Sequence, residues 1–137
     1  MGQSLKHYAF ENAAVRLAGV DATREFLEPM FADRDRELLL VALCDDNLRL
    51  VRLLSLPGTE AEVKAPLPKI MRLAVKSGCT GIVVAHNHPS GELRPSDRDL
   101  AFTRRLSIAV QSVDITILDH LIFNCAPAFS FRRQGLL

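Results

Sequence analysis

The stretch GIVVAHNHPSGELRPSDRD, residues 81–99, decides the fold and the candidate site of this chain. It opens with an apolar, β-branched run of strand length that ends at His86-Asn87-His88. A loop rich in proline and glycine follows, and Ser96 then precedes a long amphipathic pattern. The stretch therefore predicts a buried strand, a loop and the beginning of a helix.

Three side chains around this loop are of types that bind metals, namely His86, His88 and Asp99. Residues i and i+2 of a strand point to the same face, so both histidines can approach one ion at about 2.0–2.1 Å. With Ser96 as N-cap, Asp99 is the third residue of the helix, where the helix dipole favours a carboxylate that reaches the same ion. Two imidazoles, one carboxylate and a fourth position open to water are typical of a catalytic zinc site.

Such a site also needs a base and a group that stabilises an oxyanion. Glu37 begins an otherwise apolar strand, and we interpret it as the general base that takes a proton from the water. The hydroxyl of Ser96 is the candidate donor to the oxyanion. Each residue also has a plainer interpretation. Ser96-x-x-Asp99 alone indicates a helix capping box, and Glu37 alone is an ordinary charge at a strand end.

Two other metal-site families share part of this pattern. His86-x-His88-x-x-x-Glu92 is similar to the first motif of a cupin, but a cupin is an all-β chain with a second histidine motif. A metallo-β-lactamase has an Asp-His pair directly after the histidines, where this chain has Pro89-Ser90-Gly91. We expect His120 to bond to backbone; the alternative places it, with Asp119, beside a metal ligand that it orients.

The remaining sequence alternates helical and strand patterns, which predicts a mixed α/β layer architecture with a central sheet. The expected elements are a short helical stripe between Phe10 and Ala18, a helix capped by Asp21 or Thr23 and ending at Ala32, strands 37–44 and 48–56 as a hairpin, a short strand 59–64, a helix from Pro66 to Gly78, a helix after Ser96, and strands 115–123 and 129–131. The 137 residues fit one domain.

Composition limits the possible functions. The chain has 17 Lys+Arg against 16 Asp+Glu and few aromatic residues, so it has no overall electrostatic footprint for nucleic acid. No apolar run approaches the ~20 residues of a membrane span, and the first residues have no secretory pattern. Cys44, Cys79 and Cys125 are widely spaced, which predicts reduced core thiols in a cytoplasmic protein.

Taken together, Glu37, His86-x-His88 and Ser96-x-x-Asp99 resemble the JAMM motif of the MPN/JAB-domain metalloproteases. The segments AHNHPSG (85–91), PS (95–96), TRRL (103–106), LDH (118–120) and SFRRQGLL (130–137) are most similar to the RadC-type branch of that family. The resemblance runs over residues 21–137, after an N-terminal extension of residues 1–20.

The resemblance implies a cytidine-deaminase-like α/β/α sandwich, the MPN/JAB fold, with a mixed central sheet. It also implies one Zn²⁺ per chain, held by His86, His88 and Asp99 with water as the fourth ligand. Glu37 would then be the general acid/base and Ser96 the oxyanion stabiliser. The implied reaction is hydrolysis of a peptide or isopeptide bond in a peptide or protein substrate.

RadC-type chains usually carry a helix-hairpin-helix region before this domain. About 20 residues precede the first expected helix here, so we do not expect that region or its DNA-binding role. Between Leu56 and Pro68 the sequence departs from the usual pattern of the RadC-type branch, so we infer no substrate contacts there. The alternatives are a DNA-repair-associated accessory protein without proteolytic activity and an interaction module with a structural metal. The open fourth position argues against the latter.

Overall fold

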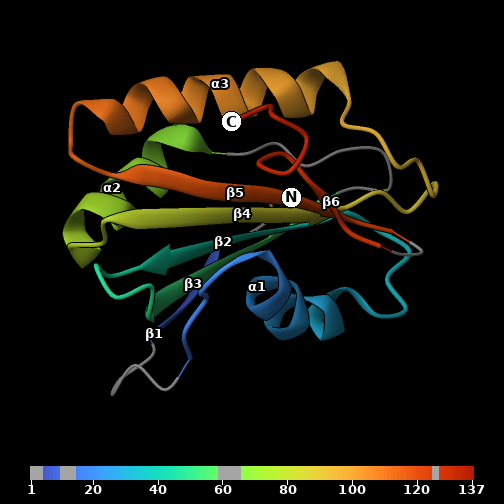
Figure 1. Cartoon of the computed structure of the whole chain (residues 1–137), viewed down its shortest axis with the longest axis horizontal. Coiled ribbons are helices and arrows are strands. Elements are labelled where there is room, and N and C mark those ends of the chain that lie inside the picture. Colours follow the sequence, from blue (N-terminus) through green and yellow to red (C-terminus); the bar gives the residue numbers. More distant parts are fainter. Residues whose placement is uncertain (1–4, 10–14, 59–65, 125–126) are drawn as a thin grey trace.

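The computed structural model describes residues 5–9, 15–58, 66–124 and 127–137, which form one mixed sheet between two layers of helices (Figure 1). The strands lie in the order β1-β3-β2-β4-β5-β6. Their bounds are Lys6–Ala9 (β1), Leu38–Cys44 (β2), Leu50–Pro57 (β3), Gly81–Asn87 (β4), Thr116–Phe123 (β5) and Phe129–Ser130 (β6). The pairing of β4 with β5 is parallel and the others are antiparallel, so the predicted mixed α/β fold is confirmed.

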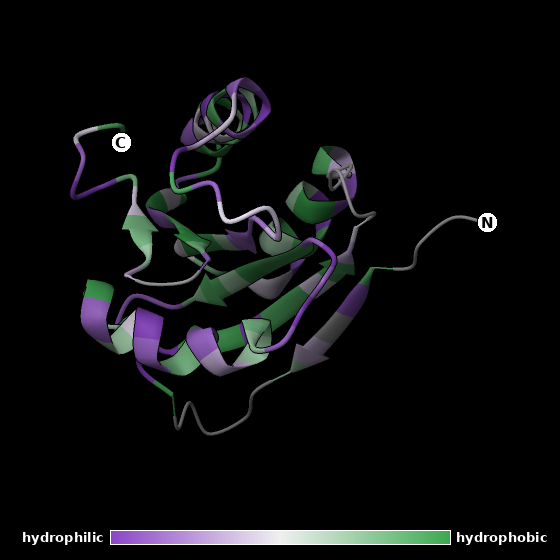
Figure 2. Ribbon diagram, turned by 90° about the vertical axis from the view of Figure 1, so that its right-hand side faces the viewer, coloured by the Kyte–Doolittle hydropathy of each residue, from purple (hydrophilic) through white to green (hydrophobic). Residues whose placement is uncertain are grey.

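The helices cover the two faces of the sheet unequally. On one face α2 (Leu67–Ser77) and α3 (Asp97–Gln111) pack against the strands, and on the other lie α1 (Val20–Leu27) and the short 3₁₀ helix η1 (Glu28–Phe31). The strands between them are largely apolar, as the hydropathy colouring in Figure 2 shows. We call the first side the α2/α3 face.

Alternation along the strands determines which residues reach each face. In β2, Leu39, Val41 and Leu43 belong to the core of the α2/α3 face, whereas Leu40 and Ala42 belong to the opposite core. In β4 the even-numbered Ile82 and Val84 face α2 and α3. The next even-numbered residue of β4 is His86, so the same alternation directs its side chain to the α2/α3 face.

Local signals at two helix ends are as expected. Gly78 caps the C-terminus of α2 with φ +73°, a conformation that glycine adopts without the steric penalty of a Cβ. Ser96 is the N-cap of α3 and forms a capping box with Asp99, each side chain accepting from the other's backbone N–H. The beginning of α3 therefore holds Asp99 in a fixed place.

The first helix differs from the prediction. Gly19 is its N-cap, not Asp21 or Thr23, and the hydroxyl of Thr23 instead donates to the carbonyl of Gly19 at 2.7 Å. The α-helix ends at Leu27, and η1 replaces the last turns that had been expected up to Ala32. Pro29 explains the change, because it has no N–H with which to continue the helical hydrogen bonds.

The segment before that helix was also predicted wrongly. Residues 6–9 form β1, an edge strand antiparallel to β3, and Leu17 lies in a connection outside any helix. Most of the expected helical stripe and the expected strand 59–64 fall outside the described residues. Within the described part of the chain, no helix is long and apolar enough to cross a membrane.

Candidate metal centre

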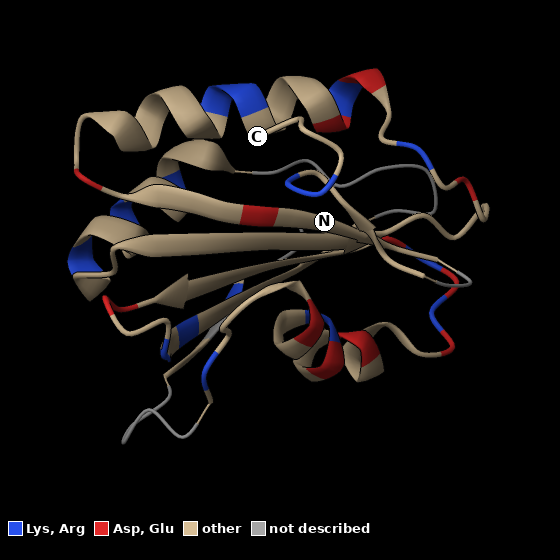
Figure 3. Ribbon diagram, in the orientation of Figure 1, with Lys and Arg blue, Asp and Glu red and all other residues tan. Residues whose placement is uncertain are grey.

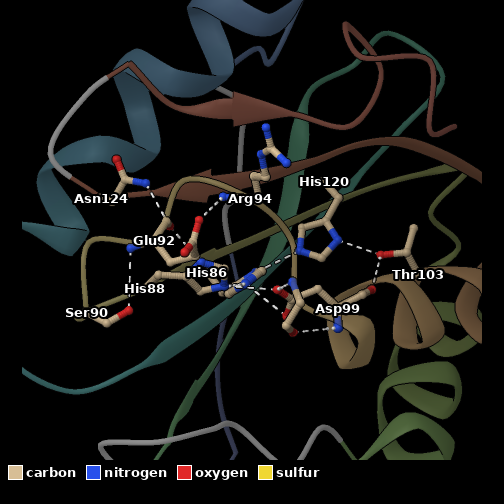
Figure 4. Close-up of polar contacts among 10 residues, drawn as sticks. His86, His88, Ser90, Glu92, Arg94, Asp99, Thr103, His120 and Asn124 are labelled. Carbon is tan, nitrogen blue, oxygen red and sulfur yellow. Dashed lines mark hydrogen bonds and ion pairs between the residues drawn. The ribbon is translucent and has the colours of Figure 1, made fainter.

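The end of β4 and the beginning of α3 bring His86, His88 and Asp99 together (Figure 4). The Nε2 atoms of the two histidines are 3.0 Å apart. Oδ1 of Asp99 lies 3.1 Å from Nε2 of His86, and its Oδ2 lies 2.9 Å from Nε2 of His88. Both histidines are buried, and the aspartate is partly exposed at the surface of the cleft. The predicted metal-ligating side chains therefore converge on one point.

Asp99 is held at this point by the capping box. Its Oδ2 accepts from the backbone N–H of Ser96 at 2.8 Å, and its own N–H donates to the Ser96 hydroxyl at 3.1 Å. The two interpretations of Ser96-x-x-Asp99, cap and metal site, are therefore compatible. The same carboxylate caps the beginning of α3 and faces the histidines.

A backbone carbonyl assigns the tautomer of His88. Nδ1 of His88 lies 2.9 Å from the carbonyl oxygen of Glu92. A carbonyl only accepts, so Nδ1 carries the proton and donates it. The neutral ring then presents the lone pair of Nε2 to Asp99 and His86, as a metal-ligating histidine does.

A chain of three side chains assigns the tautomer of His86 in the same way. The hydroxyl of Thr103 donates to the carbonyl of Asp99 at 2.9 Å, so its oxygen accepts from Nδ1 of His120 at 2.6 Å. Nε2 of His120 is then unprotonated and accepts from Nδ1 of His86 at 2.7 Å. Nε2 of His86 is therefore also left with a lone pair that faces Asp99.

A β-bulge places His120 on this side of the sheet. Ile82 pairs with Ile117, but Val83 pairs with Asp119, so the extra residue between them reverses the alternation of β5. His120 consequently faces α3, where it is 1% exposed and stacks on Phe131 with ring centroids 4.3 Å apart. The expectation that this ring bonds to backbone is wrong, and the alternative, that it orients a ligand, fits the structure.

Asp119 fixes the C-terminal segment rather than the ligand. Its carboxylate accepts from the hydroxyl of Ser130 at 2.6 Å and from the backbone N–H of Arg132 at 3.1 Å. These bonds hold Phe131 against the ring of His120. Two neighbouring residues of β5 thus have different roles: Asp119 fixes the C-terminal segment, and His120 bonds to the candidate ligand His86.

The charges of the centre shift three pKa values. Burial would raise the pKa of Asp99, but when protons rather than a cation occupy Nε2 of His86 and His88, their hydrogen bonds to the carboxylate outweigh burial and hold that pKa far below its usual range. The same hydrogen bond to Asp99 stabilises a proton on Nε2 of His88 and so raises the pKa of that ring, and a cation bound at Nε2 would take the place of this proton. Burial and the neighbouring His86 lower the pKa of His120, so that ring stays neutral, as its assigned tautomer requires.

The donor set fits a divalent cation. Two imidazole lone pairs and a carboxylate are the ligands that zinc takes at a catalytic site. Tetrahedral zinc ligands with bonds of about 2.0–2.1 Å are about 3.3 Å apart. Here the two Nε2 atoms are 3.0 Å apart, Oδ1 of Asp99 is 3.1 Å from Nε2 of His86, and Oδ2 is 2.9 Å from Nε2 of His88. A small outward shift of the rings and a turn of the carboxylate therefore accommodate the ion. With both Nε2 atoms unprotonated, a cation also relieves the repulsion among three electron-rich atoms.

An open cleft of about 1050 Å³ surrounds these residues, and both predicted catalytic side chains line it. Glu37 lies just before β2 and is half-buried, and its charge contributes to raising the pKa of His88. Ser96 is exposed at the first turn of α3. The structure thus places Glu37 and Ser96 beside the three candidate ligands, and the chemical roles assigned to them remain predictions.

Two contributors were not found from the sequence. Thr103 lies in the TRRL segment of the resemblance, but its role was not indicated, because that role depends on a partner 17 residues away in β5. The carbonyl of Glu92 was invisible for the same reason, since the course of the loop determines where it points. The one available signal was the Asp119-His120 pair, which interrupts an apolar strand.

The fold and the site define an α/β protein of the MPN/JAB type with a candidate metal centre. A family model described as the RadC-like JAB domain matches residues 17–136, so the chain belongs to the RadC-like JAB domain family. The JAB family includes metal-dependent hydrolases.

Two curated relatives support this assignment. The chain is 33% identical over 122 residues to a UPF0758 protein of Aeromonas hydrophila subsp. hydrophila, which covers 88% of this chain and 54% of that protein. It is 35% identical over 113 residues to a UPF0758 protein of Acidithiobacillus ferrooxidans, which covers 82% of this chain and 50% of that protein. The chain thus spans about half the length of the curated relatives it matches.

Proposed function

We propose that the chain is a zinc-dependent hydrolase that cleaves an amide bond, as a metallopeptidase or isopeptidase does. The observation that carries the proposal is the convergence of His86 Nε2, His88 Nε2 and an Asp99 carboxylate oxygen beside Glu37 in an open cleft. Three protein ligands leave a fourth tetrahedral position, which is the arrangement of a catalytic rather than a structural zinc.

One zinc ion bound by these ligands would supply a Lewis acid and lower the pKa of a coordinated water. The carboxylate of Glu37 takes one proton of the attacking water and later gives it to the nitrogen of the leaving amine. The C–N bond breaks, and the products are a carboxylic acid and an amine. The hydroxyl of Ser96 donates to the oxyanion that develops on the carbonyl oxygen.

The substrate class that we propose is a peptide or protein. The cleft is open to solvent, and besides polar residues its lining includes Leu39, Ala101 and Phe102. An extended backbone with one apolar side chain fits such a cleft. We also propose the cytoplasm as its compartment, because the two described cysteines, Cys44 and Cys79, are buried free thiols, as a reducing environment favours.

The alternative is a nucleic-acid-associated accessory protein without proteolytic activity. Arg94, Arg98 and Arg105 line the cleft and would suit phosphates. However, Glu37, Glu92, Asp97 and Asp99 line it too, and Figure 3 shows both signs of charge interspersed at this end of α3. A mixed surface favours the hydrolase.

The test compares Glu37→Gln with wild type on a mixed peptide library and on isopeptide-linked peptides, with products read by mass spectrometry. We expect zinc-loaded wild type to release new amino termini, and Glu37→Gln to keep zinc but lose at least about 100-fold in rate. Glu25→Gln, the same change at an exposed position of α1, is the control. Full activity in Glu37→Gln would contradict the role of the base. Salt-dependent DNA binding without hydrolysis would favour the alternative.

A further inference from the structure

Asn87 stands between the two candidate ligand histidines, yet its side chain serves a different partner. It is 5% exposed and bonds across to the segment that enters β2. Its Oδ1 accepts from the backbone N–H of Leu38 at 2.7 Å, and its Nδ2 donates to the backbone carbonyl of Arg36 at 3.0 Å. One amide thus makes a donor and an acceptor bond to two backbone groups that flank a single residue, Glu37.

The backbone of Glu37 is also held from the other side. Its carbonyl accepts from the N–H of Gly58, directly after β3, at 2.7 Å. The two peptide groups that flank Glu37 are therefore bonded to Asn87 of β4 on one side and to Gly58, just after β3, on the other. The candidate base lies outside the regular strand, and these three bonds fix its backbone.

The two side-chain bonds of Asn87 continue the connection between β4 and the β2 segment beyond the last paired residues. The register of β2 with β4 ends at Leu39 opposite His86. One residue further on, the side chain of Asn87 takes over the bond to Leu38 that a backbone carbonyl would otherwise make. Leu39 faces α2 and α3, so Glu37, two residues before it, is directed to the same face as the histidines. A slip by one residue would turn Glu37 away from them.

We propose that Asn87 is a positioning residue for Glu37: its carboxamide fixes the entry of β2 so that the carboxylate faces the metal centre. The inference rests on the proposed function, in which Glu37 is the base. It explains why the residue between the histidines carries both a donor and an acceptor. His86 and His88 present their rings to the candidate metal position on one side of the strand. The side chain of Asn87 instead bonds to the backbone on either side of Glu37.

The test uses the full chain with three substitutions. Asn87→Ala removes both bonds, and Asn87→Asp keeps the acceptor for Leu38 but loses the donor to Arg36. Asn47→Ala makes the same change at an exposed turn at the far end of the hairpin and is the control. The readouts are zinc stoichiometry, hydrogen exchange of the Leu38 amide, and the pH midpoint of the visible spectrum of the Co²⁺-substituted protein, with Glu37→Gln as reference.

We expect Asn87→Ala to keep about one metal per chain and to exchange the Leu38 amide at least about tenfold faster. Its cobalt midpoint should move in the same direction as that of Glu37→Gln, because the carboxylate no longer contacts the open coordination position. Asn87→Asp should keep the slow exchange of Leu38 but still move the midpoint. Asn47→Ala should match wild type in all three readouts.

Three results would separate the failures. If Glu37→Gln moves the cobalt midpoint and Asn87→Ala does not, Asn87 is a structural residue and the inference is overturned. If Glu37→Gln itself leaves the midpoint unchanged, the role proposed for Glu37 fails first, and the inference fails with it. A wild-type protein that takes up no metal would overturn the proposed function irrespective of Asn87.

Discussion

Nδ1 of His86 lies 2.7 Å from Nε2 of His120, and both rings are buried. This bond joins a candidate metal ligand on β4 to a neutral histidine on β5 whose other nitrogen bonds to Thr103 on α3. Three elements of the fold thereby determine which nitrogen of His86 faces the cleft. The hydroxyl of Thr103 thus determines the tautomer of His86, although two hydrogen bonds and the ring of His120 lie between them.

The first prediction concerns that hydroxyl. Thr103→Val keeps the shape of the side chain but removes the acceptor for His120, so His86 loses its fixed tautomer. We expect metal affinity to fall about 10- to 100-fold, the range typical of lost outer partners of a ligand. Competition with a chelating dye measures it. Ser112→Ala, which removes a hydroxyl bonded to a backbone carbonyl at the C-cap of α3, is the control and should bind like wild type. Wild-type affinity in Thr103→Val would refute the tautomer chain.

The second prediction separates the two roles of Ser96. Ser96→Ala removes the N-cap of α3 and should lower the free energy of unfolding by about 1 kcal/mol. Ser96→Asp restores a capping acceptor but cannot donate to an oxyanion, so it should recover stability while hydrolysis stays impaired. Urea unfolding and the peptide assay give the two quantities. Should Ser96→Asp recover hydrolysis together with stability, the residue is a cap and nothing more.

The third prediction concerns pH and a thiol far from the cleft. Burial raises the pKa of Cys44 to about 12. Below pH ~8.5 the thiol is neutral in both the folded and the unfolded chain, and its contribution to stability is constant. Above that pH the unfolded thiol ionises while the buried one does not, so stability falls by up to about 1.4 kcal/mol per pH unit until about pH 12.

The measurement is the unfolding free energy of wild type minus that of Cys44→Ala between pH 8 and 11. Taking the difference cancels the titration of other groups. The difference should decline as pH rises, by about 1–3 kcal/mol in total. A flat difference would mean that the Cys44 thiol is accessible to water in the folded protein.

How much the sequence predicts depends on how local each interaction is. The strand, loop and helix of residues 81–99 were predicted from the apolar, β-branched run, the Pro/Gly content of the loop and the Ser96-x-x-Asp99 box, and all are local signals. The convergence of His86, His88 and Asp99 was predicted from that box and from the alternation of side chains along a strand. The α2 cap at Gly78 is equally local.

What the sequence could not predict depends on contacts between distant segments. The bulge that turns His120 toward α3 is a property of the β4–β5 register, not of β5 alone. The bonds of Asn87 to the entry of β2 span about 50 residues. β1 was missed because four residues of an edge strand give little periodicity, and pairing with β3 determines them.

The central claim is that His86, His88 and Asp99 hold one zinc ion. The most direct measurement is the zinc content of purified chain after dialysis against limiting free zinc, for wild type and for His88→Ala, with folding checked by circular dichroism. We predict about one zinc per wild-type chain and almost none in a folded His88→Ala protein. A wild-type protein that folds as described and remains free of metal would contradict the claim.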